Sequence, residues 1–127
     1  MRYTRAFSLL VLILLIAIGC GGRGNLTPDK AIIGHWKKEH GTTEMFLSPD
    51  KRFIIVEGEK RGPYSYIKRE INDKDRKIAI ATTDPPLTFS YTLNADNTEM
   101  LEDAIRSGAI IFSEPTRWKY LDNKQEP

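Results

Sequence analysis

The sequence is poor in the residues that build most catalytic centres. It has one cysteine, Cys20, and two histidines, His35 and His40, among 127 residues. A lone cysteine excludes an intramolecular disulfide, a redox pair and a multi-cysteine zinc site. No serine stands in a Gly-x-Ser-x-Gly context, and no glycine-rich phosphate loop joins a strand to a helix. We therefore expect no enzymatic activity and no cofactor.

The few remaining titratable candidates are not arranged for chemistry either. His35 and His40 are five residues apart on an expected strand. Side chains at that spacing point to opposite faces of a sheet, so the two histidines cannot share a metal ion. We interpret both as solvent-facing or edge residues and expect no metal site. Glu102 and Asp103 are adjacent and point apart, which we interpret as a solvated turn.

The chain also has little excess charge of either sign. It contains 19 lysines and arginines against 17 aspartates and glutamates. Arg2 and Arg5 are the only charged residues before Cys20, so the rest of the chain carries equal numbers of each sign. A neutral chain has no overall positive field for nucleic acid, and we expect no nucleic-acid partner.

Long hydrophobic runs are absent except at the start. Residues 6–19 are almost uninterruptedly apolar, follow Arg2 and Arg5, and end in Gly19. A basic start, an apolar stretch and a small residue before the cut are typical of a secretory signal. The alternative is an uncleaved membrane anchor, but a spanning helix needs about 20 residues. The length of the run favours the signal.

With Cys20 directly after Gly19, this segment resembles the signal of bacterial lipoproteins. Ala17 stands where that pattern usually has Leu, Val or Ile. The resemblance implies cleavage before Cys20, a diacylglyceryl group on its thiol, and palmitate or a similar acyl chain on the new amine. Two or three acyl chains hold a protein on a membrane lastingly, whereas one does so only marginally.

The resemblance also implies an address and a domain organisation. The protein would be exported and lipid-anchored to the bacterial cell envelope. In a diderm host Gly21 after the cysteine favours the outer membrane, and otherwise the anchor lies on the outer face of the cell membrane. We expect a signal peptide over 1–19, a lipidated flexible tether over 20–27, one β domain over 28–121 and a polar tail over 122–127.

The pattern after the tether is β almost everywhere. Thr27 followed by Pro28 predicts one short helical turn over 28–33, which Gly34 ends. The strands that alternation predicts are 34–40, 43–47, 52–57, 63–68, 77–83, 87–93, 98–101, 109–112 and 116–121. The stretch 99–105 is compatible with a strand or a helix. Eight or nine short strands with turns between them predict an all-β, antiparallel up-and-down meander.

The helical turn, then Gly34-His35-Trp36 at the first strand, then a β-meander, resembles the lipocalin-like (calycin) domains. The resemblance implies a small barrel in which Trp36 plugs one end. A cation of the closing strand often lies beside that tryptophan, and Arg117 is the candidate. Eight strands leave an interior that side chains fill or that holds one small ligand. The aromatic content favours a filled interior, with a ligand-bearing barrel as the alternative.

Charge is unevenly distributed along the expected domain. Residues 51–77 contain nine positive and five negative side chains, whereas residues 84–114 contain six acids and one base. In a meander these stretches form two halves of the barrel, so we expect a dipolar surface.

The basic half contains two adjacent pairs of cations. Lys51-Arg52 begins one expected strand and Lys68-Arg69 ends its neighbour, so both pairs should meet at one barrel end. We interpret these four residues as a candidate contact for anionic lipid or an anionic envelope polymer. The alternative is a solvated rim that blocks edge-to-edge aggregation.

The sequence thus favours a membrane-anchored envelope lipoprotein of the non-catalytic binding or interaction type. Its expected partners are the membrane, through the lipid on Cys20, and an envelope protein or an anionic envelope polymer. One alternative is a carrier of a small apolar ligand in the barrel. Another is an inhibitor of an envelope hydrolase, because Ser107-Gly108 resembles part of the Ser-Gly-x-x-Tyr segment of lysozyme-inhibiting lipoproteins, although the tyrosine is missing.

Overall fold

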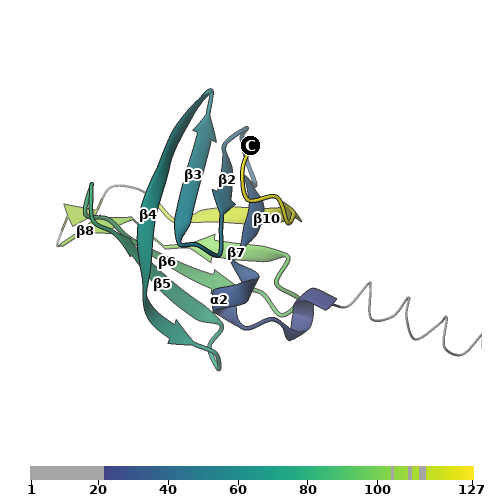
Figure 1. Ribbon diagram of the computed structural model, residues 1–127. Coiled ribbons are helices and arrows are strands. Elements are labelled where there is room, and N and C mark those ends of the chain that lie inside the picture. The colour runs from purple at the N-terminus through teal and green to yellow at the C-terminus, as the bar shows by residue number, and fades with distance from the viewer. Residues whose placement is uncertain (1–21, 104, 109, 112–113) are drawn as a thin grey trace, which may run out of the picture.

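A computed structural model describes residues 22–103, 105–108, 110–111 and 114–127. Their fold is all-β, and eight antiparallel strands close into a barrel (Figure 1). Cys20 and the expected signal lie outside the described residues.

Two short helical turns precede the strands, namely η1 (Gly22–Asn25) and α2 (Pro28–Ala31). The barrel strands are β1 (Gly34–Lys38), β2 (Glu44–Leu47), β3 (Arg52–Glu57), β4 (Glu59–Asn72), β5 (Lys77–Thr82), β6 (Thr88–Leu93), β7 (Glu99–Glu102) and β10 (Thr116–Asp122). Each strand from β1 to β7 pairs with the next, and β10 pairs with both β7 and β1. The predicted up-and-down meander is therefore confirmed.

A small hairpin between β7 and β10 lies outside this closed ring. Its strands are β8 (Arg106–Ser107) and β9 (Ile110–Ile111). β8 pairs with β6 through Arg106 opposite Thr88, and β9 pairs with β8. Ser107, which carries the resemblance to the inhibitor segment, is the last residue of β8.

The longest strand, β4, differs most from its expected bounds, because 63–68 was predicted and the strand runs from Glu59 to Asn72. Its first half pairs with β3 and its second half with β5. The register shifts between Lys68 and Glu70, and such a bulge bends a strand so that it can serve two neighbours. The ambiguous stretch 99–105 begins as strand β7.

The barrel interior contains the large side chains that alternate along the strands. Those buried in one cluster include Trp36, Met45, Leu47, Phe53, Tyr66, Ile78, Ile80, Phe89, Tyr91, Leu93, Met100 and Trp118. Phe53 of β3 and Phe89 of β6 meet edge to face, with ring centroids 5.4 Å apart. The barrel walls therefore touch through their side chains across the interior.

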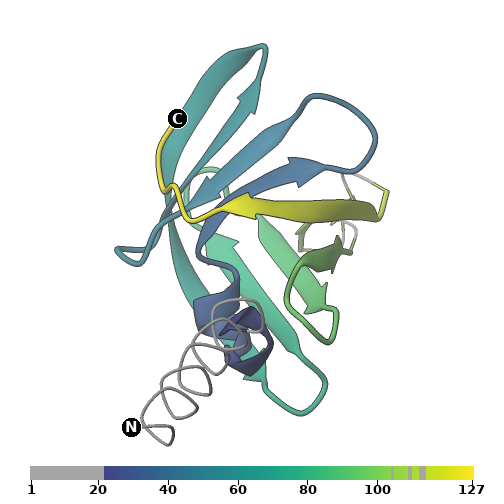
Figure 2. The ribbon, with the colours of Figure 1, turned by 90° about the vertical axis from the view of Figure 1, so that its right-hand side faces the viewer.

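One barrel end is covered by helical turns, and we call it the helical end. Figures 1 and 2 show α2 and η1 at this end, while the β3–β4 hairpin rises at the opposite end. Trp36 is fully buried beneath α2, and its indole Nε1 donates a hydrogen bond to the carbonyl oxygen of Ile32 at 2.9 Å. Trp36 thus closes the helical end from inside the barrel.

Candidate functional site

The four cations singled out in the sequence lie on neighbouring segments. The carbonyl oxygen of Lys51 accepts a hydrogen bond from the backbone N–H of Tyr66 at 2.9 Å, and Arg52 lies opposite Ser65. The start of β3 therefore lies beside β4 a few residues before Lys68. β4 does not end there, so Lys68 and Arg69 occupy the bend of a continuous strand.

Acidic partners neutralise half of this group. Arg52 forms an ion pair with Asp50, with Nη2 2.8 Å from Oδ2. Lys68 lies 3.9 Å from the carboxylate of Asp29 in α2, which places Lys68 at the helical end. A hydrogen bond from the Ser48 hydroxyl, and then Arg52, hold the pKa of Asp50 below its usual value. The result is a mixed-charge surface.

The cation that lies beside Trp36 is Arg23, which the sequence did not single out. Its guanidinium carbon is 3.4 Å from the ring centroid of Tyr120 and 5.8 Å from that of Trp36. Nη2 donates a hydrogen bond to the carbonyl oxygen of Ala31 at 2.7 Å, and Nε donates to that of Asn97 at 3.1 Å. A cation over an aromatic face is attracted more strongly as water is excluded.

Asn97 holds the same segment from the other side. It is fully buried in the turn between β6 and β7, where its φ of 59° is one that asparagine tolerates. Its side-chain amide donates to the carbonyl oxygens of Arg23 and of Leu26, the latter at 3.0 Å. Arg76 donates to its Oδ1. We call Arg23, Leu26 and Asn97 the N-terminal clasp.

Because of the N-terminal clasp, part of the expected tether belongs to the folded domain. Residues 20–27 were predicted to be flexible because glycines dominate them, but from Gly22 onward the chain forms η1 and α2 and is bonded to the barrel. The partners of Arg23 lie as far as 74 residues away in the sequence. No pattern in the sequence around Arg23 predicts contacts to residues so distant in the chain.

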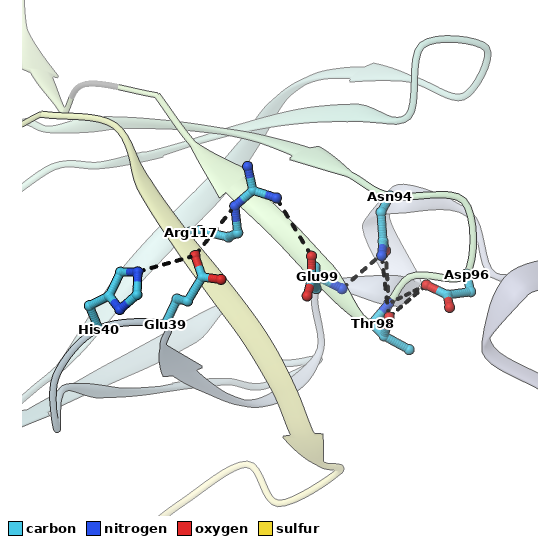
Figure 3. A network of polar contacts seen from close by, with 7 residues as sticks. All are labelled: Glu39, His40, Asn94, Asp96, Thr98, Glu99 and Arg117. Atoms are coloured by element: carbon cyan, nitrogen blue, oxygen red, sulfur yellow. Dashed lines mark hydrogen bonds and ion pairs between the residues drawn. The ribbon is translucent and has the colours of Figure 1, made fainter.

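The expectation that Arg117 lies beside the first tryptophan is wrong. Arg117 is about half exposed on the outer face, 3.5 Å from Glu39 and 3.6 Å from Glu99 (Figure 3). Trp118 is the neighbour that points inward, so alternation sends Arg117 outward. Beside these ion pairs, the side-chain oxygen of Asn94 accepts a hydrogen bond from the Thr98 N–H at 3.0 Å.

His35 is also placed differently from its prediction, because it is buried, whereas the side chain of His40 is 92% exposed as expected. Its Nε2 lies 2.8 Å from Glu44 and its Nδ1 3.2 Å from Asp122. Its ring stacks on Phe46 with centroids 4.1 Å apart. Each ring nitrogen of His35 thus faces a carboxylate oxygen. His35 links β2 and β10 across β1.

The interpretation of Glu102 as part of a solvated turn is wrong, because Glu102 is buried in strand β7. It is 4% exposed and lies opposite Tyr91 in the register of β6 and β7. Burial raises the pKa of Glu102 to about 7, against the opposing effects of the Tyr91 hydroxyl, the Trp118 indole and the charge of Lys38. Extending the alternation of Met100 by two residues would have turned Glu102 inward, which is the signal that was available.

Trp118 adds a second polar group to this part of the interior. It is 5% exposed, and its indole Nε1–H is directed toward the Glu102 carboxyl without forming a hydrogen bond of good geometry to any described residue. Buried donors usually have a well-formed hydrogen bond, so this poorly aligned pair is an exception. Glu102, Tyr91 and Trp118 therefore form a polar spot within an otherwise apolar barrel.

The described part of the chain contains neither a candidate metal site nor a candidate membrane-spanning helix. No cluster of histidine, cysteine, aspartate and glutamate side chains there is arranged to hold a metal ion. The helices there are too short or too polar to cross a membrane. Comparison with protein-family models, with curated protein sequences and with solved structures finds no match.

Proposed function

We propose that this chain is a lipid-anchored protein of the bacterial cell envelope and that its barrel is a non-catalytic binding or interaction module. The observation that carries the proposal is the position of Cys20, directly after a basic start, an apolar run and Gly19. The closed eight-strand barrel, with Trp36 at the end where the chain enters, supports a lipocalin-like domain over 28–121. Its partners would be the membrane and an envelope protein or anionic envelope polymer.

The test is metabolic labelling with an alkyne-bearing palmitate analogue in a bacterial host. The parent chain should take up the label and separate with membranes. Cys20→Ser should lose the label, because the hydroxyl cannot replace the thiolate as the alkylated group. Ala17→Leu is the matched control, since it brings the segment closer to the usual lipoprotein pattern and should keep the label. Labelling of Cys20→Ser equal to that of the parent would refute the proposal.

A second candidate function is the transport of a small apolar ligand inside the barrel. The poorly aligned indole N–H of Trp118 beside the buried Glu102 favours it, because a ligand with a hydrogen-bond acceptor could bind between these polar groups. A fluorescent fatty acid, cis-parinaric acid, is a suitable probe. Saturable binding that Trp118→Phe weakens would support a carrier, and the absence of saturable binding to the parent would leave only the interaction module.

A further inference from the structure

We infer that the barrel sits with its helical end against the lipid surface that holds Cys20, and that its opposite end points away from the membrane. The inference rests on the proposed lipidation of Cys20. It goes beyond that proposal, because lipidation alone leaves the orientation of the domain open.

Only a short stretch of chain separates the proposed anchor from the fold. Arg23 is the third residue after Cys20. Consecutive Cα atoms are about 3.8 Å apart, so the Cα of Arg23 lies at most about 11 Å from that of Cys20 in any conformation of the intervening chain. This limit is covalent and holds at any ionic strength.

Arg23 is itself bonded to the barrel. Its guanidinium lies over Tyr120 of β10, and its side chain and backbone bond to Asn97. The next residue, Gly24, lies against the same turn, since a Cβ built on it would be 3.9 Å from the carbonyl oxygen of Ala95. The segment cannot swing away from the barrel without breaking the N-terminal clasp.

The helical end is the surface that this short reach brings to the lipid headgroups. Arg23 is at the helical end, together with α2 and the turn between β6 and β7 (Figure 2). β1 runs from the helical end, so the β1–β2 turn around Thr42 lies at the opposite end. A tether of about 11 Å that joins the barrel at the helical end is too short to let the opposite end face the lipid.

Charge is not the cause of this orientation. Cations at the helical end, such as Lys30 and Lys51, are accompanied by Asp29, Asp50 and Asp96. Such a mixed surface gains little from an anionic membrane. We therefore expect the orientation to be the same on zwitterionic and anionic bilayers.

Energy transfer to labelled lipids measures the orientation. With the Cys20 thiol alkylated, an added cysteine is the single reactive thiol of the chain. Ala95→Cys reports the helical end and Thr42→Cys reports the opposite end, and both positions are exposed. Each lipidated, donor-labelled protein is reconstituted in phosphatidylcholine vesicles that carry a headgroup acceptor. A strand of six residues spans about 20 Å, so transfer should be several-fold more efficient from position 95 than from position 42.

A flexible insertion provides the matched control. Fifteen Gly and Ser residues between Gly21 and Gly22 leave the N-terminal clasp intact and add an average reach of about 20 Å. The difference between the two positions should then largely disappear. Equal transfer from both positions without the insertion would overturn the inference while lipidation stands. A chain that carries no lipid by mass spectrometry and does not float with vesicles would instead refute the proposed function, and the orientation with it.

Discussion

The carboxyl group of Glu102 lies among aromatic side chains inside the barrel, with a pKa of about 7. An unfolded chain would return this pKa to about 4.5. Between these two values the folded protein binds a proton that the unfolded chain has already lost. The free energy of unfolding must therefore fall as the pH rises from about 4.5 to about 7.

Glu102→Gln should remove this pH dependence, because glutamine keeps the shape of the side chain and does not ionise. A pKa shift of one unit corresponds to about 1.4 kcal/mol. As the pH rises from about 4 to about 8, the unfolding free energy of the variant should therefore increase relative to that of the parent by up to about 3 kcal/mol. Urea unfolding at several pH values measures the difference. Asp103→Asn, at an exposed neighbouring position, should follow the parent curve. Parallel curves for Glu102→Gln and the parent would contradict the burial of this carboxyl.

Trp36 combines packing with a hydrogen bond at the helical end. It meets Tyr120 edge to face at 5.3 Å and donates to Ile32. Trp36→Ala should cost about 3–5 kcal/mol of unfolding free energy, as deletions of large aromatic side chains in cores do. Trp36→Phe keeps a ring there and should cost clearly less. A thermal midpoint for Trp36→Ala within a degree or two of the parent would show that the residue is not a core plug.

Among the elements, η1 and α2 cover the barrel end although each has only four residues. Helices this short are not stable alone, so tertiary contacts must hold them. The N-terminal clasp and the fully buried Ala31 and Ile32 supply those contacts. The order of this segment therefore depends on the turn that carries Asn97.

Asn97→Gly tests that dependence, because glycine accepts the positive φ and removes only the side-chain amide. The carbonyl oxygens of Arg23 and Leu26 then lose a partner, at a cost of about 1–3 kcal/mol. Hydrogen exchange should become faster for residues 22–27, while peptides from β5 and β6 stay protected. Ala95→Gly in the same turn is the control, because the Ala95 side chain is exposed, and it should leave 22–27 unchanged. Unchanged exchange in Asn97→Gly would mean that the clasp does not hold the segment.

Prediction from the sequence succeeded where the signal is local. Alternation in 87–93 and the β-rich run 52–57 gave strands within a residue of β6 and β3. It failed for Arg23, whose partners Asn97 and Tyr120 are distant in the chain, and for Arg117, where the resemblance outweighed the alternation. It also stopped β4 too early, because the bulge between Lys68 and Glu70 breaks the periodicity. Cys20 and the contact of Lys51, Arg52, Lys68 and Arg69 with an anionic surface stay predictions.

At the scale of the whole molecule, the basic half of the barrel is not a bare positive patch. Arg52 and Lys68 each have an acidic partner, in Asp50 and Asp29. Each lysine or arginine near an anionic membrane is worth about 1 kcal/mol, and salt screens the attraction. Any affinity of the domain without its lipid must therefore be weak.

A soluble form beginning at Gly21 should bind phosphatidylglycerol vesicles weakly at low salt and lose the binding as salt rises. Replacing Lys51, Arg52, Lys68 and Arg69 together by glutamine should remove the binding and keep the fold. The matched control replaces four exposed cations elsewhere, Lys37, Lys60, Arg61 and Lys119, and should retain it. Equal binding by the parent and the first variant would leave the solvated rim as the interpretation of these residues.

The pairing of β1 with β10 has a consequence for how such a chain would cross a membrane. Tyr120 lies opposite Trp36, so the barrel can close only when the last strand, β10, pairs with the first strand, β1. Without β10 the sheet has two free edges, at β1 and β7, and its interior is open to water. If the chain is exported as proposed, this topology would delay closure of the barrel until the whole domain has crossed the membrane. It also means that a chain cut short before β10 would be an open sheet prone to aggregation, and not a smaller barrel.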